Sequence, residues 1–282
     1  MSSILGRRAL RLLIAFLMGV GLVGVAGPAS ASSAPSPRPT YLALGDSVPF
    51  GFRGNLPPVL YRFPQLFVGY PQMVGPTLGL STVNASCPGE TTTSFVTGKG
   101  SNGCEDNVDG GSVYRGNFPL HVHYRGTQLD YALEALEGDA NVRLVTVMLG
   151  ANDAFLCQKT TPDQCVSELP GVVAKVGTNL AFILGRLRGA YDGKIVVVTY
   201  YALDYGSADP NFQGTVLLNQ AIRGTAAKAG AVVADGFGAF QQRALQAGGS
   251  SVAAGLLLAN DVHPTLLGQV LLARAVDQAV GH

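Results

Sequence analysis

The chain has 282 residues, of which 47% are hydrophobic and 13% are charged, and its formal net charge is +1 at pH 7. Proteins that bind nucleic acid carry basic patches or stripes, so this near-neutral balance argues against a nucleic-acid partner. A chain of this length can bury a large core and is compatible with one domain.

The first residues have the three-part pattern of a secretory signal peptide. Arg7, Arg8 and Arg11 precede an apolar run over residues 12–25, and Ala29-Ser30-Ala31 offers a small-residue cleavage site. A spanning helix needs about 20 apolar residues, which is more than this run supplies. We therefore expect a secreted, extracellular protein that keeps no membrane anchor after cleavage, with the choice between Sec and twin-arginine export left open.

Three regions follow from this pattern. Residues 1–31 are the expected signal peptide, and residues 32–39, rich in Ser, Pro and Ala, read as a disordered lead-in. The functional domain then covers residues 40–282.

Apolar runs alternate with segments of helical periodicity along this domain. Buried strands are expected at 41–44, 81–85, 142–149, 194–200 and 231–233. Helices are expected at 70–78, 124–136, 171–187, 212–229, 237–247 and 264–280, the last with Pro264 in its first turn. This alternation predicts an α/β fold, a three-layer α/β/α sandwich around a parallel five-stranded sheet.

Polar and glycine residues follow the first three predicted strands. Ser47 follows the first strand, Gly89 the second and Asn152 the third. The carboxyl ends of parallel strands meet at one edge of the sheet, which is where such folds place their ligand crevice. We therefore expect these three residues to lie close together.

Three short segments supply the parts of a serine ester hydrolase: Gly45-Asp46-Ser47, Gly150-Ala151-Asn152-Asp153 and Asn260-Asp261-Val262-His263-Pro264. A serine hydroxyl needs a base such as histidine, together with donors aimed at the developing oxyanion. Each segment has a plainer interpretation, because Asp, Ser and Asn also cap helices; Asp153 is one candidate for that role. The nucleophile-elbow spacing is absent around Ser47, which argues against the α/β-hydrolase fold.

Taken in order, these segments and Gly89 within Ser86-Cys87-Pro88-Gly89-Glu90-Thr91-Thr92 resemble the SGNH hydrolases, also called GDSL-type esterases and lipases. The resemblance spans the whole domain, and it includes in particular secreted actinobacterial members with disulfide-tied loops. It implies a flavodoxin-like arrangement of the sheet, Ser47 as the nucleophile and His263 as the general base. It also implies an oxyanion hole made by the N–H groups of Ser47 and Gly89 and the amide of Asn152.

The acid of the triad departs from that family pattern. The family usually places it three residues before the histidine, where this chain has Asn260, whereas the carboxylate of Asp261 lies two residues before. Two alternatives stay open. Either an altered turn presents Asp261, or a carbonyl of Asn260 orients His263 in a Ser-His dyad.

Four cysteines in an exported chain predict two disulfides. We favour the pairs Cys87–Cys104 and Cys157–Cys165, because each pair brackets a polar or glycine-containing loop that follows a motif-bearing strand. A zinc site is the alternative, but the spacings fit no paired-cysteine ligand pattern.

Two further features have plain interpretations. His121 and His123 lack an obvious third metal ligand, so we interpret them as surface or crevice residues. The aromatic and proline-rich segment over residues 50–70 is either a hydrophobic wall that receives an acyl chain beside Ser47 or the ordinary packing of a long loop.

The sequence as a whole predicts a secreted serine carboxylic ester hydrolase, of lipase, esterase or phospholipase type, that works through an acyl-enzyme. We expect a monomer that acts on a small-molecule or lipid ester without a cofactor or metal. The alternatives are a carbohydrate de-O-acetylase of the same fold and a non-catalytic cell-surface glycan-binding protein.

Overall fold

The computed structural model describes residues 38–108, 110–206 and 210–281; the expected signal peptide and most of the lead-in lie outside them. Five strands form one parallel sheet in the order β2-β1-β3-β4-β5. They are β1 (Thr40–Gly45), β2 (Ser81–Asn84), β3 (Val142–Met148), β4 (Lys194–Val198) and β5 (Val232–Ala234). Each strand lies where the apolar runs predict one.

The burial of the strands explains why they appear as continuous apolar runs. In β1, β3 and β4, nearly every residue after the first or second is buried, whereas β2 and β5 at the two edges of the sheet are more exposed. Because helices cover both faces of a parallel sheet, its central strands have no solvent side on which polar residues would alternate. The core of the molecule therefore lies on both faces of these three strands.

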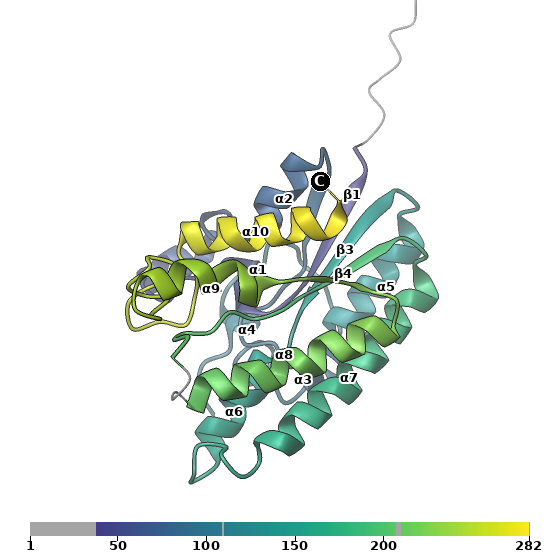
Figure 1. The fold of residues 1–282 in the computed structure, drawn as a ribbon. Helices are drawn as coiled ribbons and strands as arrows, with labels where there is room; N and C mark the ends of the chain where they lie inside the picture. The colour runs from purple at the N-terminus through teal and green to yellow at the C-terminus, as the bar shows by residue number, and fades with distance from the viewer. Residues whose placement is uncertain (1–37, 109, 207–209, 282) are drawn as a thin grey trace, which may run out of the picture. The chain divides into compact units, whose positions relative to one another are not determined.

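Helices form a layer on each face of the sheet, which completes the three-layer α/β/α sandwich (Figure 1). One layer contains α2 (Pro71–Thr77), α9 (Gly236–Gln246) and α10 (Leu266–Val280). The other contains α3 (Thr92–Thr97), α5 (Gln128–Gly138), α6 (Ala151–Thr160), α7 (Leu169–Ala190) and α8 (Pro210–Lys228). No described helix combines the length and the apolarity that crossing a membrane requires.

The six helices with clear periodicity are present. The elements that the sequence did not predict are short, except for the ten-residue α6. These are α1 (Ser47–Phe50), α3, α4 (Tyr114–Asn117), α6 and two 3₁₀ helices, η1 (Pro58–Arg62) and η2 (Pro64–Leu66). One expected detail is wrong: Pro264 is not in the first turn of α10. The side chain of Thr265 caps that helix, and Pro264 forms a β-bridge with Leu257 just before it.

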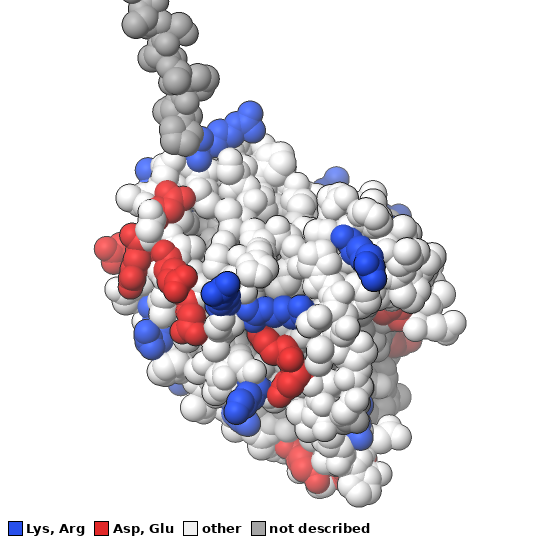
Figure 2. Space-filling view, turned by 180° about the vertical axis from the view of Figure 1, so that it is seen from behind, with Lys and Arg blue, Asp and Glu red and all other residues white. Residues whose placement is uncertain are grey.

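Charged side chains are sparse on the surface that Figure 2 shows. On that face, lysine and arginine side chains are spread among uncharged ones and are not gathered into one basic patch. This distribution agrees with the low fraction of charged residues in the chain.

Candidate active site

Ser47 begins helix α1 directly beyond the end of β1. Gly45 has a φ of +143°, and a Cβ there would lie 2.3 Å from the carbonyl oxygen of Met148, so the close approach of two strands requires glycine. Asp46 is the N-cap of α1, because its side chain accepts a hydrogen bond from the N–H of Val48. The capping role therefore belongs to Asp46, and the hydroxyl of Ser47 is directed elsewhere.

That hydroxyl lies beside the imidazole of His263, although 216 positions separate the two residues. Ser47 Oγ is 2.9 Å from His263 Nε2, and on the other side of the ring Nδ1 is 2.5 Å from Asp261 Oδ1. The ring of Phe52 packs edge-on against the imidazole, with 5.0 Å between the ring centroids. A histidine held between a carboxylate and a serine hydroxyl has the geometry of a general base that acts on that serine.

An altered turn presents Asp261 to the histidine. Asn260 has a φ of +56°, a left-handed conformation that asparagine tolerates better than most residues. The second carboxylate oxygen of Asp261 accepts a hydrogen bond from the backbone N–H of Gly54 at 3.0 Å. Among the described residues, Asp261 and not Asn260 contacts the imidazole of His263. Of the two alternatives, the geometry therefore favours the triad.

The surroundings of Asp261 keep it ionised. Its partial burial acts to raise its pKa, but hydrogen bonds from His263 and Gly54 outweigh that effect and hold the pKa below its ordinary value. An ionised carboxylate at this place can stabilise the imidazolium that forms when His263 takes up a proton.

Asp46 is a second carboxylate near the serine, in a different environment. It is fully buried, and burial raises its pKa to about 6, against the lowering effect of hydrogen bonds from Tyr200 and Val48. The Tyr200 hydroxyl donates to Asp46 Oδ2 at 2.5 Å. The hydrogen bonds of Asp46 run to Val48 and Tyr200, so they hold the turn around Ser47.

Gly89 and Asn152 line the same cleft as Ser47 and His263. Gly89 has a φ of +86°, and a Cβ there would lie 2.6 Å from the carbonyl oxygen of Asn102, so this position requires glycine. The buried side chain of Asn152 accepts a hydrogen bond at Oδ1 from Asn102 Nδ2, 2.9 Å away. Its Nδ2 group is then the part of the amide that can donate to a bound oxyanion.

The capping interpretation of the segment after β3 is wrong. Gly150 is the N-cap of α6, and no side chain caps that helix. Asp153, the residue considered for capping, instead binds Thr92, accepting from its N–H at 2.9 Å and from its hydroxyl at 2.6 Å. Asp153 thus connects α6 to the start of α3, and Asn152 is left to face the cleft.

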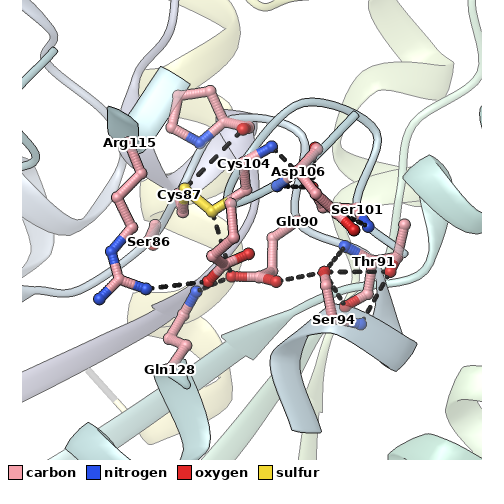
Figure 3. Close-up of a disulfide and its surroundings, with 12 residues drawn as sticks. Ser86, Cys87, Glu90, Thr91, Ser94, Ser101, Cys104, Asp106, Arg115 and Gln128 are labelled. Carbon is pink, nitrogen blue, oxygen red and sulfur yellow. Dashed lines mark hydrogen bonds and ion pairs between the residues drawn. A yellow bond between two sulfur atoms is a disulfide. The ribbon is translucent and has the colours of Figure 1, made fainter. Parts of the chain in front are cut away.

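Both disulfides are present in the favoured pairing, Cys87–Cys104 and Cys157–Cys165. Figure 3 shows Glu90 beside the first of them, where Ser94 and Gln128 donate to its two carboxylate oxygens. Burial holds the pKa of Glu90 well above its usual value. The loop closed by Cys87–Cys104 contains Gly89, so the disulfide restricts the segment that brings Gly89 to the cleft.

Gln128 joins this loop to the turn that precedes Ser47. Its side chain accepts from the N–H of Gly45 at 2.6 Å and donates to the carbonyl of Gly45 at 3.0 Å. It also donates to Glu90 Oε2 at 3.0 Å. One buried amide therefore connects the segments that hold Ser47 and Gly89.

Two cavities meet at Ser47. The first, called the enclosed cavity below, has a volume of about 290 Å³ and extends between α6, α8 and the segment after β4. Its apolar walls include Val48, Ala151, Ala154, Phe155, Leu169, Leu203, Leu218 and Val262. The second, called the open cleft, has a volume of about 600 Å³ and contains His263, Gly89 and Asn152. From Ser47, a bound molecule could therefore extend in either of two directions, of which the enclosed cavity is the narrower.

The aromatic segment over residues 50–70 was expected to be either a hydrophobic wall beside Ser47 or an ordinarily packed loop, and parts of it fit each interpretation. Phe52 and Tyr61 line the open cleft, whereas Phe50, Phe67 and Tyr70 are buried in the core. The segment therefore forms part of a wall beside Ser47, but the enclosed apolar cavity lies elsewhere and is built mainly by α6, α8 and the residues after β4.

His121 has the plain role expected of it. Its Nε2 lies 2.9 Å from the carbonyl oxygen of Phe50, and its ring packs on that phenylalanine. Two groups in the described part of the chain bring potential metal ligands together, Cys87 with Glu90 and Cys104, and Cys157 with Cys165 and Glu168. In both groups the sulfur atoms are joined in disulfides, whereas zinc takes free thiolates.

Sequence reasoning missed several residues around the site: Gly54, Asn102, Gln128 and Lys159. Each acts through a contact with a distant part of the chain; Lys159 Nζ, for example, is 2.8 Å from Asn102 Oδ1. No local motif marks them. Only the position of Asn102 within the disulfide-closed loop was a signal that could have drawn attention to it.

Comparisons with known proteins agree with this geometry. The profile of the family described as GDSL-like Lipase/Acylhydrolase family matches residues 43–271. The search of curated proteins found no match. Among solved structures, Axe2, an acetylxylan esterase from Geobacillus stearothermophilus, superimposes with a TM-score of 0.58 at 17% identity, covering 87% of this chain and 95% of that one. LAE5, described as an alpha/beta hydrolase enzyme from the metagenome of Lake Arreo, Spain, gives a TM-score of 0.57 at 18% identity, covering 87% of this chain and 96% of that one. At these identities the structural likeness concerns the fold.

Proposed function

Because this chain belongs to the GDSL-like lipase/acylhydrolase family, the SGNH hydrolases, we propose that it is a secreted serine carboxylic ester hydrolase that works through an acyl-enzyme. The observation that carries the proposal is the hydrogen-bonded series Asp261–His263–Ser47, which lies where the enclosed cavity and the open cleft meet.

In the first half of the proposed reaction, Ser47 Oγ attacks the carbonyl carbon of the ester while His263 Nε2 takes its proton. The carbonyl oxygen becomes an oxyanion, which receives hydrogen bonds from Asn152 Nδ2 and from the N–H groups of Ser47 and Gly89. The bond to the alcohol then breaks, and His263 gives the proton to the leaving oxygen. In the second half, water attacks the acyl-enzyme with His263 again as the base, and the carboxylic acid is released.

The enclosed cavity supports an acyl group longer than acetyl. It begins at Ser47 and Val48, and residues of α6 and α8, such as Ala154 and Leu218, continue its apolar lining. An acyl chain that leaves water for such a cavity gains roughly 0.8 kcal/mol for each buried CH₂ group. We therefore assign the acyl chain to the enclosed cavity and the alcohol part of the ester to the open cleft.

A specific observation favours a second candidate, a carbohydrate de-O-acetylase. Aromatic side chains line the open cleft: Phe52, Tyr61, Tyr114 and Phe118. Aromatic faces offer large, rigid contact surfaces for a ring-shaped alcohol such as a sugar. Axe2, a structure of similar fold, is an acetylxylan esterase. In this candidate only the acetyl group would enter the enclosed cavity.

Two features support the proposal that the protein is secreted and acts outside the cell, like the family members whose loops are tied by disulfides. The sequence begins with the pattern of an export signal, and both cysteine pairs form disulfides, which persist in oxidising compartments. We also propose that it acts as a monomer, which sedimentation velocity would test.

The experiment that tests the function compares the parent protein with Ser47→Ala on three kinds of substrate: p-nitrophenyl esters from acetate to decanoate, phospholipid vesicles and acetylated xylan. We expect hydrolysis that Ser47→Ala reduces by more than about a thousandfold without a change in the circular dichroism spectrum. A maximum at medium or long acyl chains supports the lipase or esterase proposal, whereas activity confined to acetyl groups on sugars supports the de-O-acetylase. Hydrolysis that survives Ser47→Ala would refute covalent catalysis by this serine.

A further inference from the structure

Asn102 contacts both of the residues that accompany Ser47 in the oxyanion hole. Its backbone N–H donates to the carbonyl of Gly89 at 2.8 Å, and its side-chain Nδ2 donates to Asn152 Oδ1 at 2.9 Å. It lies two residues before Cys104, inside the loop closed by the Cys87–Cys104 disulfide. A half-buried residue of this loop therefore reaches across to helix α6, which carries Asn152.

Lys159 fixes which way the amide of Asn102 is turned. This residue lies near the end of α6, and its Nζ donates to Asn102 Oδ1 at 2.8 Å. A lysine ammonium can only donate hydrogen bonds, whereas an amide has one accepting end and one donating end. With the oxygen of Asn102 facing Lys159, its NH₂ group must face Asn152. The oxygen of Asn152 is then engaged, and its own NH₂ group is left for the cleft.

We propose that Lys159 and Asn102 are positioning residues that hold the Asn152 amide with its donor toward the oxyanion. This inference rests on the proposed function, because it assigns a task to Asn152 that only an oxyanion-stabilising hydrolase requires. Neither residue takes part in bond making. They act by removing the flipped state of Asn152, in which the oxygen instead of the NH₂ group would face the developing negative charge.

A direct contact of Lys159 with substrate would give a different kinetic pattern. Lys159 is exposed and lines the open cleft, so it is also placed to touch the alcohol part of an ester. Loss of such a contact would change KM for charged or polar substrates and would leave neutral esters unaffected. Loss of oxyanion positioning would lower kcat on every ester, including small neutral ones, with little change in KM.

The variants that separate these roles change which hydrogen bonds the side chains at positions 102 and 159 can make. Asn102→Asp replaces the donor that faces Asn152 by an acceptor, which draws the NH₂ group of Asn152 away from the cleft. Asn102→Ala removes the partner without attracting the wrong end of Asn152. Lys159→Glu places an acceptor beside Asn102, which favours the flipped orientation of the Asn102 amide, whereas Lys159→Arg keeps a donor there. Lys228→Glu, at the exposed end of α8, is the control for the change in charge.

On p-nitrophenyl acetate, we expect kcat to fall about 100-fold in Asn102→Asp and less in Asn102→Ala, since loss of one oxyanion donor typically costs 10²- to 10³-fold. Lys159→Glu should lower kcat about tenfold or more, and Lys159→Arg should restore it to within about threefold of the parent value. KM should stay within about threefold throughout. Equal activity in Asn102→Asp and the parent, or a loss in Lys228→Glu equal to that in Lys159→Glu, would overturn the proposal.

A double-mutant cycle then tests whether Asn102 acts through Asn152. If it does, Asn102→Asp should add almost nothing to the loss caused by Asn152→Ala, because the group that it misdirects is already absent. A further 100-fold loss in the double variant would show an independent, structural effect. If the parent has esterase activity that depends on Ser47, and if no change at Asn102 or Lys159 alters that activity, only this inference is refuted. If the parent has no Ser47-dependent esterase activity, the proposed function itself is refuted.

Discussion

Gly54 donates its backbone N–H to Oδ2 of Asp261, a residue 207 positions later in the chain. The other oxygen of the same carboxylate holds His263, so Asp261 is fixed at both oxygens. A Cβ at position 54 would lie 3.0 Å from Oδ2, which leaves little room for any larger residue. The segment beyond α1 therefore supports the acid of the site as well as lining the cleft.

Asp261→Asn should lower kcat by about 10³- to 10⁴-fold, because an amide at this place favours the wrong tautomer of His263 and cannot stabilise its cation. Steady-state kinetics on a small ester would measure the loss. Asn260→Gly is the matched control, since it removes the side chain but keeps the left-handed turn. A mild effect of Asp261→Asn would favour the dyad. A large effect of Asn260→Gly would then assign the orienting carbonyl to the side chain of Asn260, and a mild effect would assign it to the backbone.

Removing each disulfide should have a different kinetic effect. The double variant Cys87→Ser/Cys104→Ser frees the loop that contains Gly89 and Asn102, so kcat should fall about 10- to 100-fold on all esters. Cys157→Ser/Cys165→Ser loosens a wall of the enclosed cavity, so KM should rise mainly for longer acyl chains. An acyl-chain series on both variants checks this, and identical profiles would contradict it.

Asp46 should make the free energy of unfolding depend on pH. Burial raises its pKa from 3.8 to about 6, so the folded protein binds this proton more tightly than the unfolded chain does. The resulting stability is fully present below pH 3.8 and is lost as the pH rises through about 6. Asp46→Asn keeps a capping side chain but cannot titrate.

As the pH rises from about 4 to about 7, the parent should lose about 2 kcal/mol of unfolding free energy that Asp46→Asn keeps. The difference in unfolding free energy, variant minus parent, should increase by that amount. Urea denaturation of both proteins at the two pH values measures this shift. A difference between parent and variant that stays constant with pH would show that Asp46 keeps an ordinary pKa in the folded protein.

Narrowing the enclosed cavity should shorten the preferred acyl chain. Ala154 lines that cavity and not the open cleft, so Ala154→Phe should reduce kcat/KM for an octanoyl ester by about tenfold or more and leave acetate within about threefold. Ser112 lines the open cleft and not the enclosed cavity, so Ser112→Phe is the matched control. If Ser112→Phe discriminates between acyl lengths and Ala154→Phe does not, the acyl chain binds in the open cleft.

The sequence predicted the parts of the fold that depend on burial along a continuous run. The runs at 142–149 and 194–200 became β3 and β4, because a strand covered on both faces must be apolar throughout. Helix α7 was likewise predicted, since its periodicity persists over many turns. Ser47, Gly89 and Asn152 could be placed at one edge of the sheet because each follows a strand, whereas Asp261 and His263 follow helix α9 and had no such signal.

The sequence could not predict features that depend on contacts between distant residues. The choice between Asp261 and Asn260 depended on a single φ angle and on the N–H of Gly54, neither of which any local pattern reveals. Short helices such as α1 and α4 are held by their surroundings and have too few turns to show periodicity. The two cavities lie between elements, so their walls became visible only when those elements were packed together.

The 216 positions between Ser47 and His263 have a consequence for how the protein acquires activity during folding. Contacts between residues so far apart form only after long loops have closed, and such closures are slow relative to the formation of single helices. Partly folded chains that already have much of their helix content should therefore be inactive. Recovery of hydrolysis after dilution from denaturant would then report the joining of the two ends of the domain, and it should lag behind the recovery of the circular dichroism signal.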